Sequence, residues 1–269
     1  MFISCLLIDV GSNPDRPRPG RLWLRNVYRV HQRLCMAFPS NSRKAEDENF
    51  LKPYSPADFA ANDVHVERGG DSGFLFRIDP RPGGNAAILV LSAKKPEWEY
   101  AFKNAQYLLA APLDDPKPLR IDLPAGSLWR FRLQANPVYR ARSSSLDRQG
   151  QPIGEKWIGK RLPVPSDDES LHNWLRRRSE SCGFQLVEIN SIQSGYVYFT
   201  KAHTSGEGQR LRSARYEGVL RVTESNLFLK TLSHGIGPAK AFGFGLLSIA
   251  SVREDHHVTE RPASAPQVP

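Results

Sequence analysis

The chain has 269 residues, a length that fits one large domain or two domains of about 100 to 130 residues each. Hydrophobic residues make up 40% of it, which is enough for an ordinary folded core. Lysine and arginine number 37 against 28 acidic residues, giving a formal net charge of +9. This balance disfavours a basic partner and favours a polyanion, nucleic acid first and an anionic membrane second. A merely basic protein without such a partner remains the alternative.

The N-terminal segment is not typical of a secretory signal. Residues 1–10 are apolar but short, no basic residue precedes the apolar run, and Asp9 interrupts it. No later segment approaches the length needed to span a bilayer. The cysteines at positions 5, 35 and 182 are odd in number and far apart, which disfavours a disulfide framework. We therefore expect a cytoplasmic protein with no membrane partner.

In chain order, the first half alternates between strand-like and helix-like patterns. Apolar residues recur at helical spacing from Trp23 to Phe38, and Pro39 stops the run. The other predicted segments are a strand over 1–10, a basic loop over 11–22, an irregular polar excursion over 40–70, strands over 73–78 and 87–92, and a possible helix over 101–109. This order suits a ferredoxin-like unit.

After a segment rich in Pro and Asp, the second half again alternates between strand-like and helix-like patterns. A helix is predicted after Ser166 or Asp167 as N-cap, with acidic residues in its first turn, arginines 176–178 late and Gly183 near its end. The other predicted segments are strands over 128–133, 196–201, 212–222 and 246–252, a basic stretch over 139–161, and a short helix over 227–233. We predict an α+β protein with two tandem ferredoxin-like (RRM-like) domains. The first domain is predicted over 1–110 and the second over 125–252. A linker is predicted over 111–124 and a disordered tail over 253–269.

Tyr28 and His31 are three residues apart on the first predicted helix, so they share one side of it. The helical pattern places His31 at the border of the apolar stripe and Tyr28 just beyond it. We therefore expect an imidazole and a phenol at a rim that a substrate can reach. The alternative is a histidine at the edge of the core with a purely structural role.

A glycine-rich run extends from Gly235 to Gly245. Its glycines at 235, 237, 243 and 245 allow close approach of a ligand, their amides can face phosphate oxygens, and Lys240 adds a positive charge. The spacings of a Walker loop and of G-x-G-x-x-G are both missing, which weakens a nucleotide-binding enzyme as an interpretation. A tight turn that packs a helix on a sheet is the structural alternative.

Basic residues cluster in two further places. Arg140 and Arg142 follow an apolar strand directly, and positions 201–215 carry Lys201, Arg210 and Arg212 near a predicted hairpin tip. Basic hairpins and loops suit nucleic-acid grooves and phosphates, although scattered charges are more often solvated surface. The seven histidines form no H-x-H or H-E-x-x-H pattern, no C-x-x-C occurs, and the G-x-S-x-G elbow is missing. We therefore expect no metal site and no cofactor.

Several stretches together resemble the CasE family, the CRISPR RNA-processing subunit of type I-E Cascade complexes. They occur in family order over about residues 1–252: Tyr28–Leu34 closed by Ala37-Phe38-Pro39; Leu91–Trp98; Phe131–Pro137 followed by Gly159–Pro163 and Trp174-Leu175; and Tyr216–Leu220 with the glycine-rich run ending Gly245–Ser248. The segments 11–20, 40–70 and the tail lie outside this resemblance.

The resemblance implies tandem ferredoxin-like domains, processing of CRISPR precursor RNA at its repeat hairpin, and retention of the cut RNA among other Cascade subunits. By position, Tyr28 and His31 match the family's catalytic pair, and the four glycines match its glycine-rich loop. Lys160 and Arg161 match a basic segment near the RNA stem. Imidazole chemistry suits metal-independent cleavage by the RNA's own 2′-hydroxyl. A non-catalytic RNA-binding or scaffold subunit of the same complex is the alternative, which only the Tyr28–His31 pair disfavours.

Overall fold

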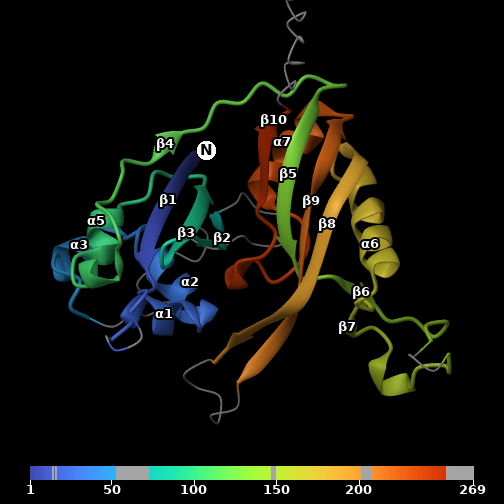
Figure 1. Ribbon diagram of the computed structural model, residues 1–269, viewed down its shortest axis with the longest axis horizontal. Helices are drawn as coiled ribbons and strands as arrows, with labels where there is room; N and C mark the ends of the chain where they lie inside the picture. The colour runs from blue at the N-terminus through green and yellow to red at the C-terminus, as the bar shows by residue number, and fades with distance from the viewer. Residues whose placement is uncertain (14, 16, 53–72, 147–149, 201–207, 253–269) are drawn as a thin grey trace, which may run out of the picture.

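The computed structural model describes residues 1–252 except 14, 16, 53–72, 147–149 and 201–207. Two antiparallel sheets lie side by side, the first built from the N-terminal half and the second from the C-terminal half (Figure 1). This arrangement confirms the α+β class. The predictions for Lys201 and for the tail over 253–269 lie outside the described residues.

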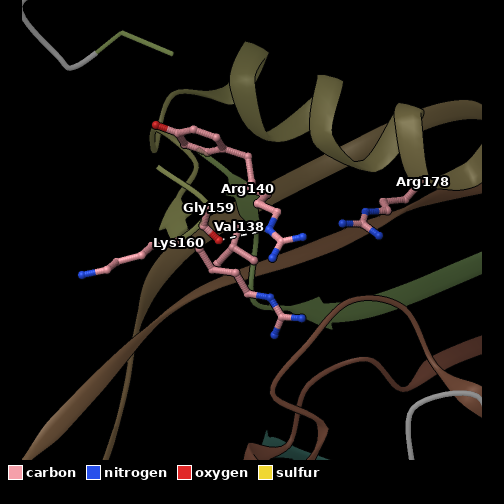
Figure 2. Close-up of a pocket in the computed structure, with 7 residues that line it drawn as sticks. Val138, Arg140, Gly159, Lys160 and Arg178 are labelled. Carbon is pink, nitrogen blue, oxygen red and sulfur yellow. Dashed lines mark hydrogen bonds between the residues drawn. The ribbon is translucent and has the colours of Figure 1, made fainter. Parts of the chain in front are cut away.

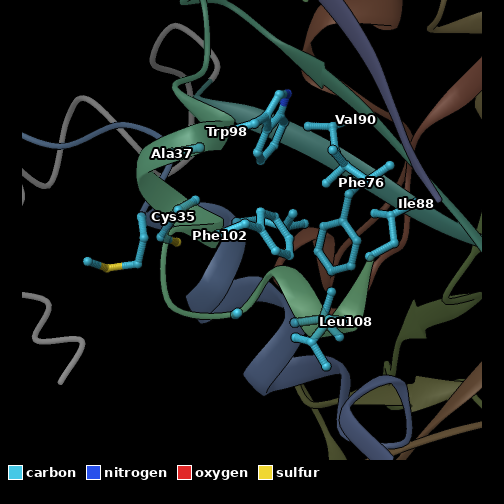
Figure 3. Close-up of a cluster of buried hydrophobic side chains, with 14 of the residues drawn as sticks. Cys35, Ala37, Phe76, Ile88, Val90, Trp98, Phe102 and Leu108 are labelled. Atoms are coloured by element: carbon cyan, nitrogen blue, oxygen red, sulfur yellow. The ribbon is translucent and has the colours of Figure 1, made fainter. Parts of the chain in front are cut away.

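The first sheet has four strands in the order β2-β3-β1-β4. Its elements in chain order are β1 (Phe2–Asp9), α1 (Pro19–Leu24), α2 (Val27–Cys35), α3 (Asn41–Glu46), β2 (Phe74–Arg81), β3 (Asn85–Ser92), α5 (Trp98–Phe102), η2 (Gln106–Leu108) and β4 (Lys117–Pro118). The helices and β2, β3 and β1 enclose a core that includes Phe76, Ile88 and Phe102 (Figure 3). Cys35, at the end of α2, is buried in the same core.

The second sheet also has four strands, in the order β10-β5-β9-β8. Its elements are β5 (Leu128–Ala135), β6 (Val138–Arg140), η3 (Glu155–Trp157), β7 (Arg161–Pro163), α6 (Asp168–Glu180), β8 (Phe184–Phe199), β9 (Gln209–Val222), α7 (Ser225–His234), η4 (Lys240–Phe242) and β10 (Leu247–Ser251). β6 and β7 form a separate two-stranded ribbon. When the strands of each four-stranded sheet are numbered in chain order, both sheets have the order fourth, first, third, second.

The helical pattern predicted over 23–38 is two helices rather than one, and the predicted basic loop over 11–22 already contains the start of α1. Asn26 separates the helices because its side-chain oxygen accepts the Tyr28 N–H at 3.2 Å and so caps α2. In the second half, Asp167 is the N-cap of α6, as predicted, and accepts the Ser170 N–H at 2.8 Å. That hydrogen bond lowers the pKa of the Asp167 carboxyl.

Three further elements differ from the sequence prediction: α3 forms inside the segment predicted as irregular, and β4 and β8 differ for identifiable reasons. β4 lies within the predicted linker, where it pairs with Phe2 and Ile3, and two residues are too few to show a periodic pattern. β8 begins at Phe184 rather than near Tyr196, because two register shifts break the alternation of its side chains. Gly218 faces this irregular part from β9, where a Cβ would lie 2.1 Å from the Glu188 carbonyl oxygen.

A buried charged network joins the two halves. The Arg77 guanidinium of β2 donates to the Arg132 carbonyl at 3.1 Å and to the Ser248 hydroxyl at 2.8 Å, both in the second half. It also donates to Asp79, which accepts a further hydrogen bond from Arg215 of β9. The side chain of Arg77 is only 3% exposed. Burial lowers the pKa of Arg77, and the Asp79 carboxylate opposes that shift. We call this network the ionic seam.

Candidate active site and nucleic-acid interface

Helix α2 carries both candidate catalytic side chains and is anchored to the second half at its first turn. The Asn26 amide nitrogen donates to the Thr200 carbonyl at 3.0 Å, and its oxygen accepts the Thr200 N–H at 3.4 Å. Thr200 follows the end of β8, so the start of α2 is tied to the long strand pair of the second half. Tyr28 and His31 follow this anchor along α2, about one helical turn from each other. Their ring centroids lie 6.5 Å apart.

His31 is buried rather than at an accessible rim, so this part of the sequence prediction was wrong. Its side chain is 7% exposed and stacks on the rings of Phe74 and Phe76, with centroids 5.4 and 6.3 Å away. Its Nε2 lies 3.6 Å from the sulfur of Cys35 one turn later. The helical period shows only which face of α2 is apolar. The side chains that cover His31 belong to β2, more than 40 residues further along the chain. Tyr28 is half-buried.

The glycine-rich run lies against the Tyr28–His31 pair. Phe242 packs on Tyr28 with ring centroids 6.2 Å apart, and a Cβ at Gly243 would lie 3.3 Å from the Phe76 ring. At the other end of the run, a Cβ at Gly237 would lie 3.4 Å from the indole of Trp174 on α6. The run therefore extends from α6 in the second half to α2 in the first.

Most glycine amides of this run serve the fold, which corrects the expectation that they are bare. The N–H groups of Gly235, Gly243 and Gly245 donate to the carbonyls of Thr231, Lys240 and Gln134, at 2.8, 3.2 and 2.8 Å. These glycines have φ between +73° and +90°, a region that favours glycine. Lys240 is half-buried within the run, and burial lowers the pKa of its ammonium group. The positive charge predicted in this loop is therefore partly desolvated.

A basic cleft lies between the β6–β7 ribbon and α6. It consists of two adjoining hollows of about 630 and 690 Å³, which share Val138, Tyr139, Arg140 and Arg178. Four residues predicted from sequence line it, namely Arg140, Arg142, Lys160 and Arg161, together with Arg177 and Arg178 of α6. Trp174, which the glycine-rich run contacts, lines it as well.

Arg177 and Arg178 were not singled out as binding residues by the sequence. Figure 2 shows Arg178 extending from the helix toward Arg140, whose Nε donates to the Gly159 carbonyl at 3.0 Å. The signal was present but unused: Trp174 and Arg178 are four residues apart, so they share a helix face, and the arginine lies over that indole at 5.7 Å. From the sequence alone, the late arginines are explained as favourable charges at a helix C-terminus.

Lys160, at the edge of the cleft, forms an exposed group with Trp157. The ammonium groups of Lys156 and Lys160 lie 5.6 and 5.4 Å from the centroid of the Trp157 ring, which itself is 42% exposed. Lys160 points away from Arg140 in Figure 2, so it extends the basic surface rather than the interior of the cleft.

The second predicted basic group, on the β8–β9 pair, divides into an exposed and a buried arginine. Arg210 is exposed and lies 4.8 Å from the centroid of the Tyr196 ring. Arg212 is only 7% exposed, and it donates to the Tyr196 hydroxyl at 3.3 Å. Arg212 therefore supports a tyrosine from within the fold, and its predicted contact with RNA stays a prediction.

Among the described residues, no three His, Cys, Asp or Glu side chains gather closely enough to hold a metal ion. In the same ranges, every helix is too short or too polar to pass through a bilayer. None of the three cysteines, which all lie in the described ranges, forms a disulfide.

Comparison with known proteins places the chain among a defined group. A family model described as CRISPR associated protein matches residues 1–251. The CRISPR-associated endoribonuclease Cse3 of Thermus thermophilus is 30% identical over 260 residues, which cover 93% of this chain and all of that protein. The CRISPR system Cascade subunit CasE of Escherichia coli is 28% identical over 234 residues, covering 86% of this chain and 95% of that protein.

Solved structures agree with the sequence comparison. A structure of the CRISPR endoribonuclease Cse3 bound to a 19 nt RNA matches with a TM-score of 0.62 and 27% identity, over 93% of this chain and 100% of that one. Cas6e of Escherichia coli, at 22% identity and a TM-score of 0.57, shares the fold over 94% of this chain and 100% of that one. With a family model matched over residues 1–251 and a relative covered from end to end, the chain belongs to the CasE family of CRISPR-associated proteins.

Proposed function

We propose that this protein is an endoribonuclease that binds the repeat hairpin of CRISPR precursor RNA, cuts it, and keeps the product within a Cascade complex. The names of the relatives support this proposal: one is a CRISPR-associated endoribonuclease, whose structure has been solved with RNA, and another is a Cascade subunit. The observation that carries it is the glycine-rich run. This run extends from the basic cleft, where RNA phosphates would bind, to the Tyr28–His31 pair, where a bond would break.

We propose further that each half is a ferredoxin-like domain. The supporting observation is that both sheets have the order fourth, first, third, second, with all pairs antiparallel. The order of elements in the first half is strand, helices, strand, strand, helices, strand. Since β4 at Lys117–Pro118 pairs with β1, we place the end of the first domain after Pro118 rather than at 110, with a linker up to residue 124.

The proposed chemistry uses the nucleophile that RNA itself carries. The 2′-hydroxyl next to the scissile phosphate attacks the phosphorus, the P–O5′ bond breaks, and the products are a 2′,3′-cyclic phosphate and a 5′-hydroxyl. The attacking hydroxyl loses a proton and the leaving oxygen gains one, so no redox partner or metal ion is needed for balance. A protein accelerates this step by aligning the two oxygens in line, moving these protons and stabilising the phosphorane charge.

His31 is the proposed proton-transfer group, because imidazole exchanges protons near neutral pH. Its ring is held by the stack on Phe74 and Phe76 and by the contact with Cys35. Tyr28, half-buried and next to it on α2, is the proposed donor that positions a phosphate oxygen or hydroxyl. Lys240 in the glycine-rich run is a candidate cation for the developing charge, since burial strengthens electrostatic interactions.

The proposal is tested with the purified protein and the repeat RNA of its own host. In EDTA we expect cleavage at one position, with a 2′,3′-cyclic phosphate at one end and a 5′-hydroxyl at the other. A matched RNA with a single 2′-deoxy substitution upstream of the scissile phosphate should bind but stay uncut, because its nucleophile is missing. Cleavage of the deoxy RNA, or loss of cleavage in EDTA, would contradict this mechanism.

The alternative is an RNA-binding or scaffold subunit without catalysis. One observation favours it: His31 is only 7% exposed, whereas a proton-transfer group must reach its substrate. Under this alternative, the basic cleft would still bind the hairpin, but the cleavage assay described above would give no product with new RNA ends.

A further inference from the structure

One tryptophan of this protein is left in water. Of the five tryptophans, all in the described ranges, only Trp157 is exposed, at 42%. It belongs to η3, in the connection between β6 and β7 over residues 141–160, and its neighbour Ile158 is 45% exposed. A large apolar ring stabilises a fold only where it is buried, whereas tryptophan is enriched where proteins contact partners. These exposed side chains therefore suit a binding contact better than a role in the core.

The backbone holds Trp157 in place although its side chain is exposed. Its N–H donates to the Gly154 carbonyl at 2.9 Å, and its carbonyl accepts the Lys160 N–H at 3.0 Å. The turn is fastened to the buried Ala141, whose carbonyl accepts the Gly159 N–H at 2.8 Å and whose N–H donates to the Lys160 carbonyl at 2.9 Å. A ring on a segment that is ordered before binding loses less conformational freedom when a ligand arrives.

Two cations accompany this ring. The ammonium groups of Lys156 and Lys160 lie 5.6 and 5.4 Å from the Trp157 ring centroid, and we call these three residues the Trp157 group. Among the described residues of the connection, Glu155 is the one acid, against Arg142 and the two lysines. A nucleotide matches this chemistry, because its base can stack on the indole while ammonium groups meet the phosphates on either side. The excess of positive charge favours RNA over a protein partner.

The Trp157 group lies across the basic cleft from the Tyr28–His31 pair. Lys160 lines the cleft on one side and Trp174 of α6 lines it on the other, where the glycine-rich run leads on to Tyr28. In Figure 1 the connection between β6 and β7 lies to the lower right of the second sheet, whereas α2 lies to its left. A base that stacks on Trp157 is therefore separated from the proposed reaction site by the basic cleft.

An RNA hairpin offers unpaired bases in two places, its loop and the strands that flank its stem. Bases inside the stem are paired and stacked on each other, so their faces are closed to a protein ring. With the cut at one end of the stem and the stem phosphates along the basic cleft, the unpaired bases at the other end are those of the loop. We propose that the Trp157 group holds the loop of the repeat hairpin, with one loop base stacked on the indole. This inference rests on the proposed function and names a further part of the RNA that the protein recognises.

The test measures binding of the non-cleavable 2′-deoxy repeat RNA and single-turnover cleavage of the normal RNA. Trp157→Ala should weaken binding roughly tenfold, the size expected for the loss of one base stack. At saturating protein the same variant should cleave at the wild-type rate, because the ring lies across the basic cleft from the cut. This combination separates a stacking contact from a disturbance of the reaction site.

Abasic substitutions, placed one at a time on the unpaired nucleotides of the loop and of both flanks, identify the base. At one loop position the abasic RNA should bind wild-type protein roughly tenfold more weakly, and Trp157→Ala should have no further effect on that RNA. Trp157→Phe keeps an aromatic ring and should bind nearly as well as wild type. Leu146→Ala removes another exposed apolar side chain, 56% exposed, from the same connection and should leave binding unchanged.

Unchanged RNA affinity in Trp157→Ala would overturn the proposal and favour a protein partner for this ring. Coupling to a flanking nucleotide rather than a loop nucleotide, or slower cleavage at saturating protein, would overturn it too, since the ring would then act beside the cut. Failure of the proposed function is a different result, because wild-type protein would then neither bind nor cut the normal RNA.

Discussion

The two halves of this protein share a strand order, but the polar groups beside the Tyr28–His31 pair are covered whereas those of the basic cleft are open to solvent. In the first half, His31 and Arg77 are packed against rings and main chain, with exposures of 7% and 3%. In the second half, Arg140, Arg161 and Arg178 are exposed around an open cleft. A proton-transfer group works only in a fixed orientation, whereas phosphates are bound well by long solvated cations. The same topology therefore supports two different tasks, according to which side chains are covered.

The largest effect on cleavage should come from a substitution in the first half, where His31 is covered. His31→Ala should slow cleavage of the repeat RNA by about 10²- to 10⁴-fold, the usual contribution of a general acid or base, while hairpin affinity stays within a few-fold. His31→Gln, which keeps a polar planar side chain without proton transfer, should be equally slow. Single-turnover cleavage and gel-shift binding measure the two quantities. Near-normal cutting by either variant would favour the scaffold function and end the catalytic assignment.

The next effect tests whether the two halves depend on each other through the ionic seam. Asp79→Ala leaves Arg77 buried without its carboxylate, so we expect a loss of about 3 kcal/mol in the free energy of unfolding. Glu217→Ala, which breaks the exposed pair between Arg132 and Glu217, should cost about 1 kcal/mol or less. Urea unfolding curves compare the variants. Equal losses would mean that the seam contributes no more than a surface ion pair.

A smaller effect, on RNA affinity, is expected from substitutions in the basic cleft of the second half. Lys160→Ala with Arg161→Ala should weaken hairpin binding for all stem sequences. The slope of log affinity against log salt should flatten by about 0.7 to 0.9 per lost phosphate contact, because each contact releases condensed counterions. Lys117→Ala with Arg120→Ala removes the same charges from exposed positions outside the described clefts and should leave the slope unchanged. If both double variants behave alike, the basic cleft is ordinary solvated surface.

The smallest effect separates two neighbours on α6. Arg178→Ala, which removes a side chain from the basic cleft, should flatten the same slope by about one contact. Arg176→Ala removes an equal charge from a side chain that donates to Asn173 and does not line the cleft, and should change little. Salt titrations of both variants decide the matter. An equal response would show that net charge, rather than the cleft, governs the affinity.

Much of the fold was predictable because its elements have local causes. The strands near residues 1–10, 87–92 and 128–133, the cap at Asp167 and the helix near 227–233 follow from alternation, capping and helical spacing. β4 and the first part of β8 were missed, since a two-residue strand has no period and bulges disturb one. The candidate site was predicted in its residue types but not in its surroundings.

The sequence by itself determined that Tyr28 and His31 share one side of a helix, that basic residues gather around 139–161, and that glycines interrupt 235–245. These are local patterns, and local geometry is sufficient to infer them. The tertiary structure decided that Phe74 and Phe76 bury His31, that Arg178 joins Arg140, and that β8 and α2 border one hollow. Each of these contacts joins segments far apart in the chain, and packing between distant elements leaves no periodic signal in either one.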